Sequence, residues 1–232
     1  MQIDTHKAEG RGKMDIDWLS TRYSFSFANW LNPERMGFGA LRVLNDDTIA
    51  PHSGFPPHSH KDMEIITLVT SGKISHTDSM GNTDIEISAG EIQIMSAGSG
   101  VTHSEMNLQH DPLTLFQIWI EPNATGIAPR YEQKKIEWIY NKTTKLVGPP
   151  KSTFPLTMHQ NAYMYGYTGH KEFTHTLSSH AHGLYVFIID GEAAIENEIL
   201  SSRDAAAITQ AADVQIQPQT NVTALLFEVP LR

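Results

Sequence analysis

Hydrophobic and polar residues alternate over short stretches along much of this chain, and glycine-containing turns separate the stretches. Between residues 54 and 120 this pattern predicts strands at 64–69, 73–77, 84–88, 91–95, 101–106 and 113–120. Two earlier stretches, 25–27 and 41–44, predict further short strands. Short strands at close spacing with turns of this kind are typical of an antiparallel sandwich or barrel.

The strand pattern stops after residue 120 and resumes near residue 163. Residues 122–129 predict a connection, and residues 130–140 fit either a short helix or an extended arm. After the break at Gly148-Pro149-Pro150, strands are expected at 163–168, 172–177, 184–189, 191–195, 213–217 and 222–229. We therefore expect an all-β protein in three parts: an amino-terminal barrel at 1–128, a connecting segment at 129–150 and a carboxy-terminal barrel at 151–232.

A faint internal repeat supports two related halves. Asp190-Gly191-Glu192 stands between two predicted strands, as Ser71-Gly72-Lys73 does in the first half. A shared turn at equivalent places indicates duplication, although one short turn is a weak signal alone.

Composition narrows the classes of function. A hydrophobic content of 40% supports a packed core, and a net charge of −9 argues against direct binding of nucleic acid. The absence of cysteine excludes disulfides, thiolate metal sites and cysteine nucleophiles. The longest apolar run, at 184–189, is far shorter than the ~18 residues needed to cross a bilayer, and no secretory signal is visible at the start. We expect a soluble, cytoplasmic monomer without a membrane partner.

The strongest chemical signal is a pair of short motifs, His58-Ser-His60 and His103-Ser-Glu105. On a strand, residues two apart point to the same face, so two neighbouring strands can aim three imidazoles and one carboxylate at one point. These ligands favour Fe, Ni, Cu, Mn or Zn over Ca or Mg. Four protein ligands leave two positions open on an ion that prefers six, as substrate and oxygen chemistry require.

The histidine content of the chain calls for care with single motifs. With 12 histidines a His-x-His pair arises easily by chance, and a second one occurs at His180 and His182. No glutamate stands four residues after that pair, and the later strands carry no histidine, so no second metal site is expected. His52, His76 and His110 are expected to be surface turn residues.

Two simpler interpretations stand beside these. The four candidate ligands could form a closed structural zinc site, but structural zinc sites without cysteine are uncommon. Met36, Phe38 and Phe55 could line a pocket for a flat aromatic substrate, and they could equally be packing residues of the core or of the barrel mouth.

Longer runs around the two motifs resemble a known family. Residues 54–65 resemble the first metal motif of cupins, and residues 90–107 resemble the second in the form found in pirins, where an acid follows the histidine by two residues. Similar segments occur at 25–29, 78–82, 117–120 and 129–133, so the resemblance covers about residues 10–140 well. The bacterial pirins described as quercetin 2,3-dioxygenases are the nearest in pattern.

The resemblance implies a bicupin fold, in which two antiparallel jelly-roll β-barrels with few short helices pack face to face. It implies a single divalent metal held by His58, His60, His103 and Glu105. Fe(II) is the expected ion, with Zn, Mn, Ni, Cu and Co as alternatives. The general cupin motif also uses an acid that corresponds here to Glu64; pirins replace it with the acid of the second motif, so Glu64 is left out.

Two functions follow from these expectations. The first is an oxidoreductase of the quercetin 2,3-dioxygenase type, which opens a flavonol-like aromatic substrate with O2 and uses Glu105 as a base near the metal. The second is a non-enzymatic protein that responds to metal or redox state and regulates a protein partner. A cleft that reaches the metal favours the enzyme, whereas a capped metal favours the docking protein.

Overall fold

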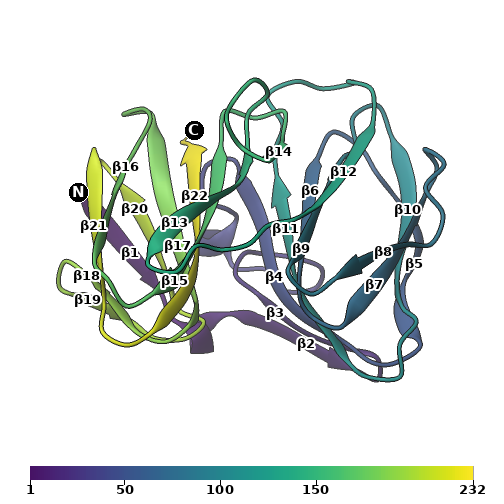
Figure 1. Cartoon of the computed structure of the whole chain (residues 1–232), viewed down its shortest axis with the longest axis horizontal. Coiled ribbons are helices and arrows are strands. Elements are labelled where there is room, and N and C mark those ends of the chain that lie inside the picture. Colours follow the sequence, from purple (N-terminus) through teal and green to yellow (C-terminus); the bar gives the residue numbers. More distant parts are fainter. Residues whose placement is uncertain (232) are drawn as a thin grey trace.

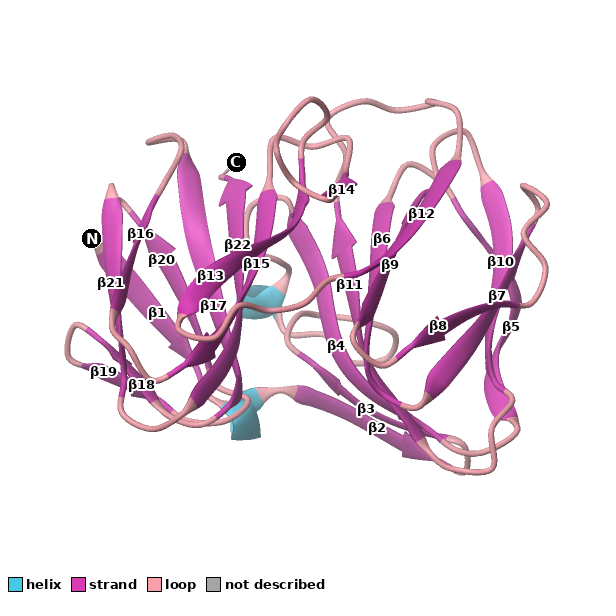
Figure 2. Cartoon of the chain, in the orientation of Figure 1, coloured by secondary structure: helices cyan, strands magenta, loops and turns pink. Residues whose placement is uncertain are grey.

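The protein is built almost entirely from β-strands arranged as two barrels, which lie side by side in the computed structural model (Figures 1 and 2). The structure describes residues 1–231. Within this range there is no α-helix, and the helical turns are the 3-10 segments η1 (Ala8–Gly10) and η2 (Pro33–Arg35). The expected all-β fold of two antiparallel barrels with few short helices is confirmed. No helix of residues 1–231 is both long and apolar enough to span a membrane.

The amino-terminal barrel, on the right in Figure 1, consists of two sheets. Its strands are β2 (Gly12–Ile16), β3 (Leu19–Tyr23), β4 (Leu41–Ile49), β5 (Ser53–His60), β6 (Glu64–Ser71), β7 (Lys73–Asp78), β8 (Ile85–Ser88), β9 (Glu91–Ser96), β10 (Val101–Asn107), β11 (Leu113–Ile120) and β12 (Arg130–Lys135). The larger sheet has the order β12-β9-β6-β11-β4-β3-β2, and the smaller sheet has the order β5-β10-β7-β8.

The carboxy-terminal barrel repeats this arrangement. Its strands are β1 (Gln2–His6), β13 (Lys142–Gly148), β14 (Leu156–Thr157), β15 (Tyr163–Gly169), β16 (Phe173–Thr176), β17 (His182–Asp190), β18 (Ala193–Ile195), β19 (Glu198–Leu200), β20 (Ala205–Thr209), β21 (Asp213–Pro218) and β22 (Val222–Pro230). The larger sheet has the order β1-β20-β17-β22-β15-β13-β14, and the smaller sheet has the order β16-β21-β18-β19.

The two larger sheets face each other and share one hydrophobic core. Ile66 and Phe116 of the first barrel belong to the same buried cluster as Phe187 and Leu225 of the second. The other faces of these sheets point into the two barrels, where Val69 and Ile188 lie in separate clusters. Strands covered on both faces read as continuous apolar runs rather than alternating ones, which explains the run at 184–189 within β17.

The shared core predicts a specific loss of stability. Leu225→Ala should lower the free energy of unfolding by about 2–5 kcal/mol, because Leu225 is fully buried in the cluster that joins the barrels. Urea denaturation followed by circular dichroism measures this loss. Ile199→Ala is the control, since Ile199 is 54% exposed, and should change the stability by less than about 1 kcal/mol. Equal losses in the two variants would contradict the proposed core.

Chain connectivity departs from the sequence-based division at three strands, one of which is β13, which lies in the predicted connecting segment but pairs with β15 of the carboxy-terminal sheet. β1 pairs with β20, so the first strand belongs to the carboxy-terminal sheet, and β12 pairs with β9, so the segment at 129–150 contributes a strand to the amino-terminal sheet. The extended arm, and not the helix, is thus the conformation at 130–135. Domain limits at 128 and 150 remain predictions, but the chain crosses between the barrels more than once.

Local differences from the predicted strands have simple causes. Residues 25–27 form no strand, because after β3 the chain turns and Phe27 makes a single bridge to Trp30. The predicted repeat, by contrast, has a structural counterpart. Gly72 joins β6 to β7 and Gly191 lies between β17 and β18, with φ of +80° and +90°, and in both barrels the chain passes there from the larger sheet to the smaller. Glycine suits both places because such φ values strain other residues.

Candidate metal centre

Two neighbouring strands of the smaller sheet bring the candidate histidines together. β5 runs antiparallel to β10, with His103 directly opposite His58 and Val101 opposite His60. β5 lies at the edge of its sheet, where Pro56 and Pro57 are tolerated because the ladder does not need their missing N–H groups. The first motif therefore lies at the end of β5.

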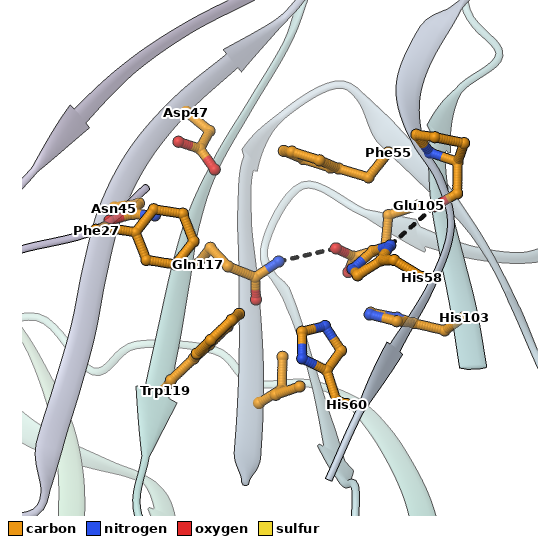
Figure 3. Close-up of a pocket in the computed structure, with 12 residues that line it drawn as sticks. Phe27, Asn45, Asp47, Phe55, His58, His60, His103, Glu105, Gln117 and Trp119 are labelled. Carbon is orange, nitrogen blue, oxygen red and sulfur yellow. Dashed lines mark hydrogen bonds between the residues drawn. The ribbon is translucent and has the colours of Figure 1, made fainter. Parts of the chain in front are cut away.

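His58, His60 and His103 converge on one point (Figure 3). Their ring centroids are separated by 4.5 Å for His58–His103, 4.8 Å for His58–His60 and 5.0 Å for His60–His103. One nitrogen of each ring lies within 4.8 Å of the others. The Nδ1–H of His58 donates to the carbonyl of Pro56 at 2.8 Å, which leaves its Nε2 lone pair free for a metal.

The chemistry of these side chains fits a divalent cation. His103 is 2% exposed, and neither of its ring nitrogens has a hydrogen-bond partner among residues 1–231. Burial, followed by the neighbouring imidazoles, lowers the pKa of His103 to about 3 and the pKa of His60 to about 4. Both rings are thus neutral at physiological pH, and a neutral imidazole offers the lone pair that a metal needs.

Glu105 lies beside the imidazoles, deep in the barrel. Its Oε1 accepts hydrogen bonds from Nε2 of Gln93 at 2.7 Å and from Oγ1 of Thr67 at 3.0 Å, and its Oε2 accepts one from Nε2 of Gln117 at 2.8 Å. Its carboxylate lies within 4.8 Å of nitrogens of His103 and His76, rather than of all three candidate ligands at once. Neutral donors thus orient this buried acid, and its role as a ligand remains a prediction.

His76 is the residue that the sequence interpretation placed wrongly. It is fully buried rather than in a surface turn, its Nε2 is 2.9 Å from Oδ2 of Asp78, and its ring lies 5.4 Å from that of His103. Side chains alternate along β7, so Ile74, His76 and Asp78 point inward together. The alternation in the sequence could therefore have predicted that His76 is buried. His52 and His110 are exposed, as expected of surface turn residues, and Nε2 of His52 lies 3.0 Å from Nδ1 of His110.

Glu64 faces away from this centre. It lies three residues before Thr67 on β6, so the two side chains point to opposite faces of the sheet. The Glu64 carboxylate accepts a hydrogen bond from Oγ of Ser96 at 2.8 Å, and burial raises its pKa. Its position on the far face agrees with leaving it out of the ligand set.

A cavity of about 350 Å³ extends from the three imidazoles across the barrel. Phe55 lies on its wall, and Figure 3 shows Phe27, Asn45 and Asp47 on the side opposite the histidines. The lining residues are Phe27, Asn45, Asp47, Phe55, Pro56, His58, His60, Ile65, His103, Glu105, Gln117 and Trp119. A space of this size, mainly apolar with a few polar groups, matches sites for small organic molecules.

Met36 and Phe38 do not line this cavity, so the structure corrects their placement in a substrate pocket and agrees with the packing alternative for Phe38. Phe38 is buried in the core between the barrels, where its ring lies 5.7 Å from that of Tyr185. Met36 is half exposed and borders a neighbouring hollow that shares Phe27 and Trp119 with the cavity. Their sequence position, close to a turn, does not reveal which side of the barrel wall they face.

Asn45 and Asp47 were missed from the sequence. Both are 3% exposed, and Oδ1 of each lacks a hydrogen-bond donor among the described residues. Burial is the main cause that raises the pKa of Asp47 to about 7. These groups therefore place two unsatisfied acceptors at the end of the cavity remote from the histidines, where a donor on a bound molecule would satisfy them.

The raised pKa of Asp47 makes stability depend on pH. The Asp47 carboxyl has its ordinary pKa of 3.8 in the unfolded chain and a pKa of about 7 in the folded protein. The protonated side chain therefore contributes to folding stability fully below pH 3.8, and this contribution is lost as the pH rises through 7. Asp47→Asn should therefore gain stability over the wild type with rising pH, on the order of 4 kcal/mol between pH 4 and 8. Urea titrations of chelator-treated protein measure it. Asp111→Asn, at an exposed acid, is the control and should show no such trend. If the stability difference between Asp47→Asn and the wild type did not change with pH, the raised pKa of Asp47 would be contradicted.

The histidines of the carboxy-terminal barrel have other partners. His182 is buried, and its Nδ1 lies 2.9 Å from Oε1 of Glu228, while Nε2 of His175 lies 3.0 Å from Oε2 of the same carboxylate. These hydrogen bonds, with those from Ser178, hold the pKa of Glu228 at about 2 against the effect of its burial. His180 is exposed. Glu228 thus serves as the hydrogen-bond partner of both buried rings.

Comparison with known proteins gives a consistent result over the whole chain. Residues 4–120 match the family described as Pirin, and residues 146–229 match the family described as quercetinase C-terminal cupin domain. A quercetin 2,3-dioxygenase of Escherichia coli (strain K12) is 39% identical over 231 residues, covering 98% of this chain and 99% of that protein. A pirin-like protein of Caulobacter vibrioides is 50% identical over 132 residues, which is 57% of this chain and 56% of that protein.

A solved structure resembles the whole molecule. The crystal structure of the bacterial pirin YhhW from Escherichia coli in complex with nickel(II) superposes with a TM-score of 0.94 at 37% sequence identity, covering 100% of both chains. That complex shows that a related fold binds a divalent transition metal.

Proposed function

Because the chain belongs to the pirin family, with its two cupin barrels, we propose that it is a metal-dependent dioxygenase that opens a flavonol-type substrate such as quercetin with O2. The observation that carries the proposal is the cavity that leads to three convergent imidazoles. An enzyme needs such access to its metal. A metal buried under a cap would instead favour a protein that responds to metal and docks onto a partner.

The proposed ligands are His58, His60, His103 and Glu105. Fe(II) is the proposed ion because it combines affinity for imidazole and carboxylate with oxygen chemistry. Ni(II) is the first alternative, in view of the nickel complex of the Escherichia coli pirin, and Zn, Mn, Cu and Co share the same ligand preference in part. When bound, such an ion supplies Lewis-acid stabilisation for an anionic oxygen of the substrate.

Apolar walls of the cavity would hold the flat rings of the substrate. Phe55 and Trp119 lie on its sides, and Phe27 lies toward the far end. Burying the rings here removes apolar surface from water and keeps bulk water away from the acid and the imidazoles. Asn45 and Asp47 would accept hydrogen bonds from hydroxyl groups at the end of the substrate remote from the imidazoles.

Glu105 is the proposed base. Its carboxylate would take the proton from the acidic hydroxyl group of the flavonol, which makes the substrate more electron-rich for its reaction with O2. Gln93, Gln117 and Thr67 hold the two carboxylate oxygens in place through neutral hydrogen bonds, so the acid is oriented before the substrate arrives.

Turnover of quercetin under air and under nitrogen tests this function. Protein reconstituted with Fe(II) should bleach the flavonol absorbance under air and leave it unchanged under nitrogen, and chelator-treated protein should be inactive in both. Equal, negligible bleaching with and without oxygen would remove the dioxygenase proposal. The same assay with Ni(II), Mn(II) and Zn(II) ranks the candidate metals.

A further inference from the structure

A second, much smaller cavity lies between the barrels, away from the metal centre. Its volume is about 10 Å³, which corresponds to the space of roughly one water molecule. Basic side chains from both halves of the chain surround it, together with two hydroxyl groups. These residues are Lys7, Arg11, Ser24, Arg35, Tyr185 and Arg203.

Positive charge exceeds negative charge around this cavity. Arg11 and Arg203 share the single carboxylate of Asp46, with contacts of 3.5 Å from Nη1 of Arg11 and 2.7 Å from Nε of Arg203. Arg35 forms no ion pair with any of residues 1–231, and Lys7 is already paired with Asp204 at 2.9 Å. One shared carboxylate therefore faces three guanidinium groups.

Burial makes this imbalance costly. The side chain of Arg11 is 6% exposed, and burial lowers the pKa of its guanidinium despite the opposing charge of Asp46. Buried charges are normally paired, because an uncompensated one loses its hydration without gaining an attraction in return. The cavity thus lies where the protein has an excess of poorly compensated positive charge.

Three buried donor atoms belong to residues that line this cavity and have no hydrogen-bond partner among residues 1–231. Nε of Arg11, Nη1 of Arg35 and Oγ of Ser24 are buried, and none has an acceptor within the described part of the chain. The hydroxyl of Tyr185 lies 3.0 Å from Nδ1 of His6, so it already has a partner. Leaving three donors without acceptors would cost on the order of 1–3 kcal/mol each, and one acceptor shared among them would remove that cost.

We propose that this cavity is a binding site for a small inorganic anion of the chloride type. A single negative charge would accept hydrogen bonds from Arg11, Arg35 and Ser24 and would offset the charge that Asp46 leaves uncompensated. Sulfate and phosphate are larger than a cavity of about 10 Å³ admits. Because Arg11, Ser24 and Arg35 precede β4 while Tyr185 and Arg203 belong to the second barrel, the anion would stabilise the joint between the two halves.

Thermal unfolding at constant ionic strength tests the proposal. Chloride is titrated against gluconate, an anion too large for the cavity, with the full-length wild type and two variants. Arg35→Gln removes one proposed ligand, and Lys135→Gln removes one positive charge from an exposed site on β12. The wild type and Lys135→Gln should show a saturable rise of the melting temperature, and Arg35→Gln should need at least about tenfold more chloride for the same rise.

A structural measurement covers the case in which Arg35→Gln folds poorly. Crystals of the wild type and of Ser24→Ala, which retains all the charges, are grown with bromide. We expect an anomalous peak within hydrogen-bond distance of Nε of Arg11 and Nη1 of Arg35 in the wild type, with lower occupancy in Ser24→Ala. The proposal is overturned if the wild type has no such peak, if its melting temperature is independent of chloride, or if Arg35→Gln responds to chloride like the wild type.

Discussion

His103→Ala should reduce the divalent metal in the purified protein from about one equivalent to less than about one tenth, and quercetin turnover should fall by at least about a thousandfold. His103 is the most deeply buried of the three convergent imidazoles, and both its ring nitrogens lack partners among residues 1–231. Elemental analysis of protein purified without added metal gives the metal content, and oxygen-dependent bleaching of quercetin gives the turnover.

A control separates loss of a ligand from a general effect of removing a histidine. His110→Ala changes an exposed imidazole of the same barrel, paired with His52 at 3.0 Å, and should leave both metal content and turnover near the wild-type values. Retention of about one metal equivalent by a folded His103→Ala protein would mean that the ligand set is wrong.

Glu105→Gln should lower kcat by about 10²–10⁴-fold when the metal is kept saturating. The amide has almost the same shape as the carboxylate, but it cannot take a proton from the substrate. Its NH2 group would face either Nε2 of Gln117 or the donors of Gln93 and Thr67, depending on its orientation. The variant should also bind the metal more weakly, since an amide oxygen is a poorer ligand than a carboxylate. Steady-state kinetics over a series of metal concentrations separates the two effects.

Substrate binding distinguishes the role of this acid further. Anaerobic titration with quercetin should show a much smaller change in affinity for Glu105→Gln than the change in kcat. Glu86→Gln, at an exposed acid paired with Lys73, is the matched control and should behave like the wild type. A Glu105→Gln variant with wild-type kcat at saturating metal would exclude Glu105 as the base.

The candidate metal site could be predicted in outline because strand geometry is local. The spacing of His58 and His60, and of His103 and Glu105, fixes a common face on each strand without knowledge of the rest of the fold. That β5 and β10 are neighbours, with His103 opposite His58, depends on strand order and register. Strand order and register are set by contacts between distant segments. The prediction that the two motifs lie side by side was therefore supported by the resemblance to the family and not by the residue spacing.

The remote end of the cavity could not be predicted for a different reason. Asn45 and Asp47 lie inside the barrel on β4, yet the apolar pattern that marked this strand ended at residue 44. Polar residues that face a functional cavity break the hydrophobic alternation on which strand prediction depends. β20 was not predicted for another reason: its three alanines have a low propensity for β-strands.

Anomalous diffraction at the absorption edge of the loaded metal tests whether one divalent ion binds the imidazoles of His58, His60 and His103 and remains accessible from the cavity of about 350 Å³. We expect a single strong peak about 2 Å from one nitrogen of each ring, with at least one coordination position directed into the cavity. A peak elsewhere in the molecule, or an ion enclosed on all sides by protein ligands, would contradict this expectation.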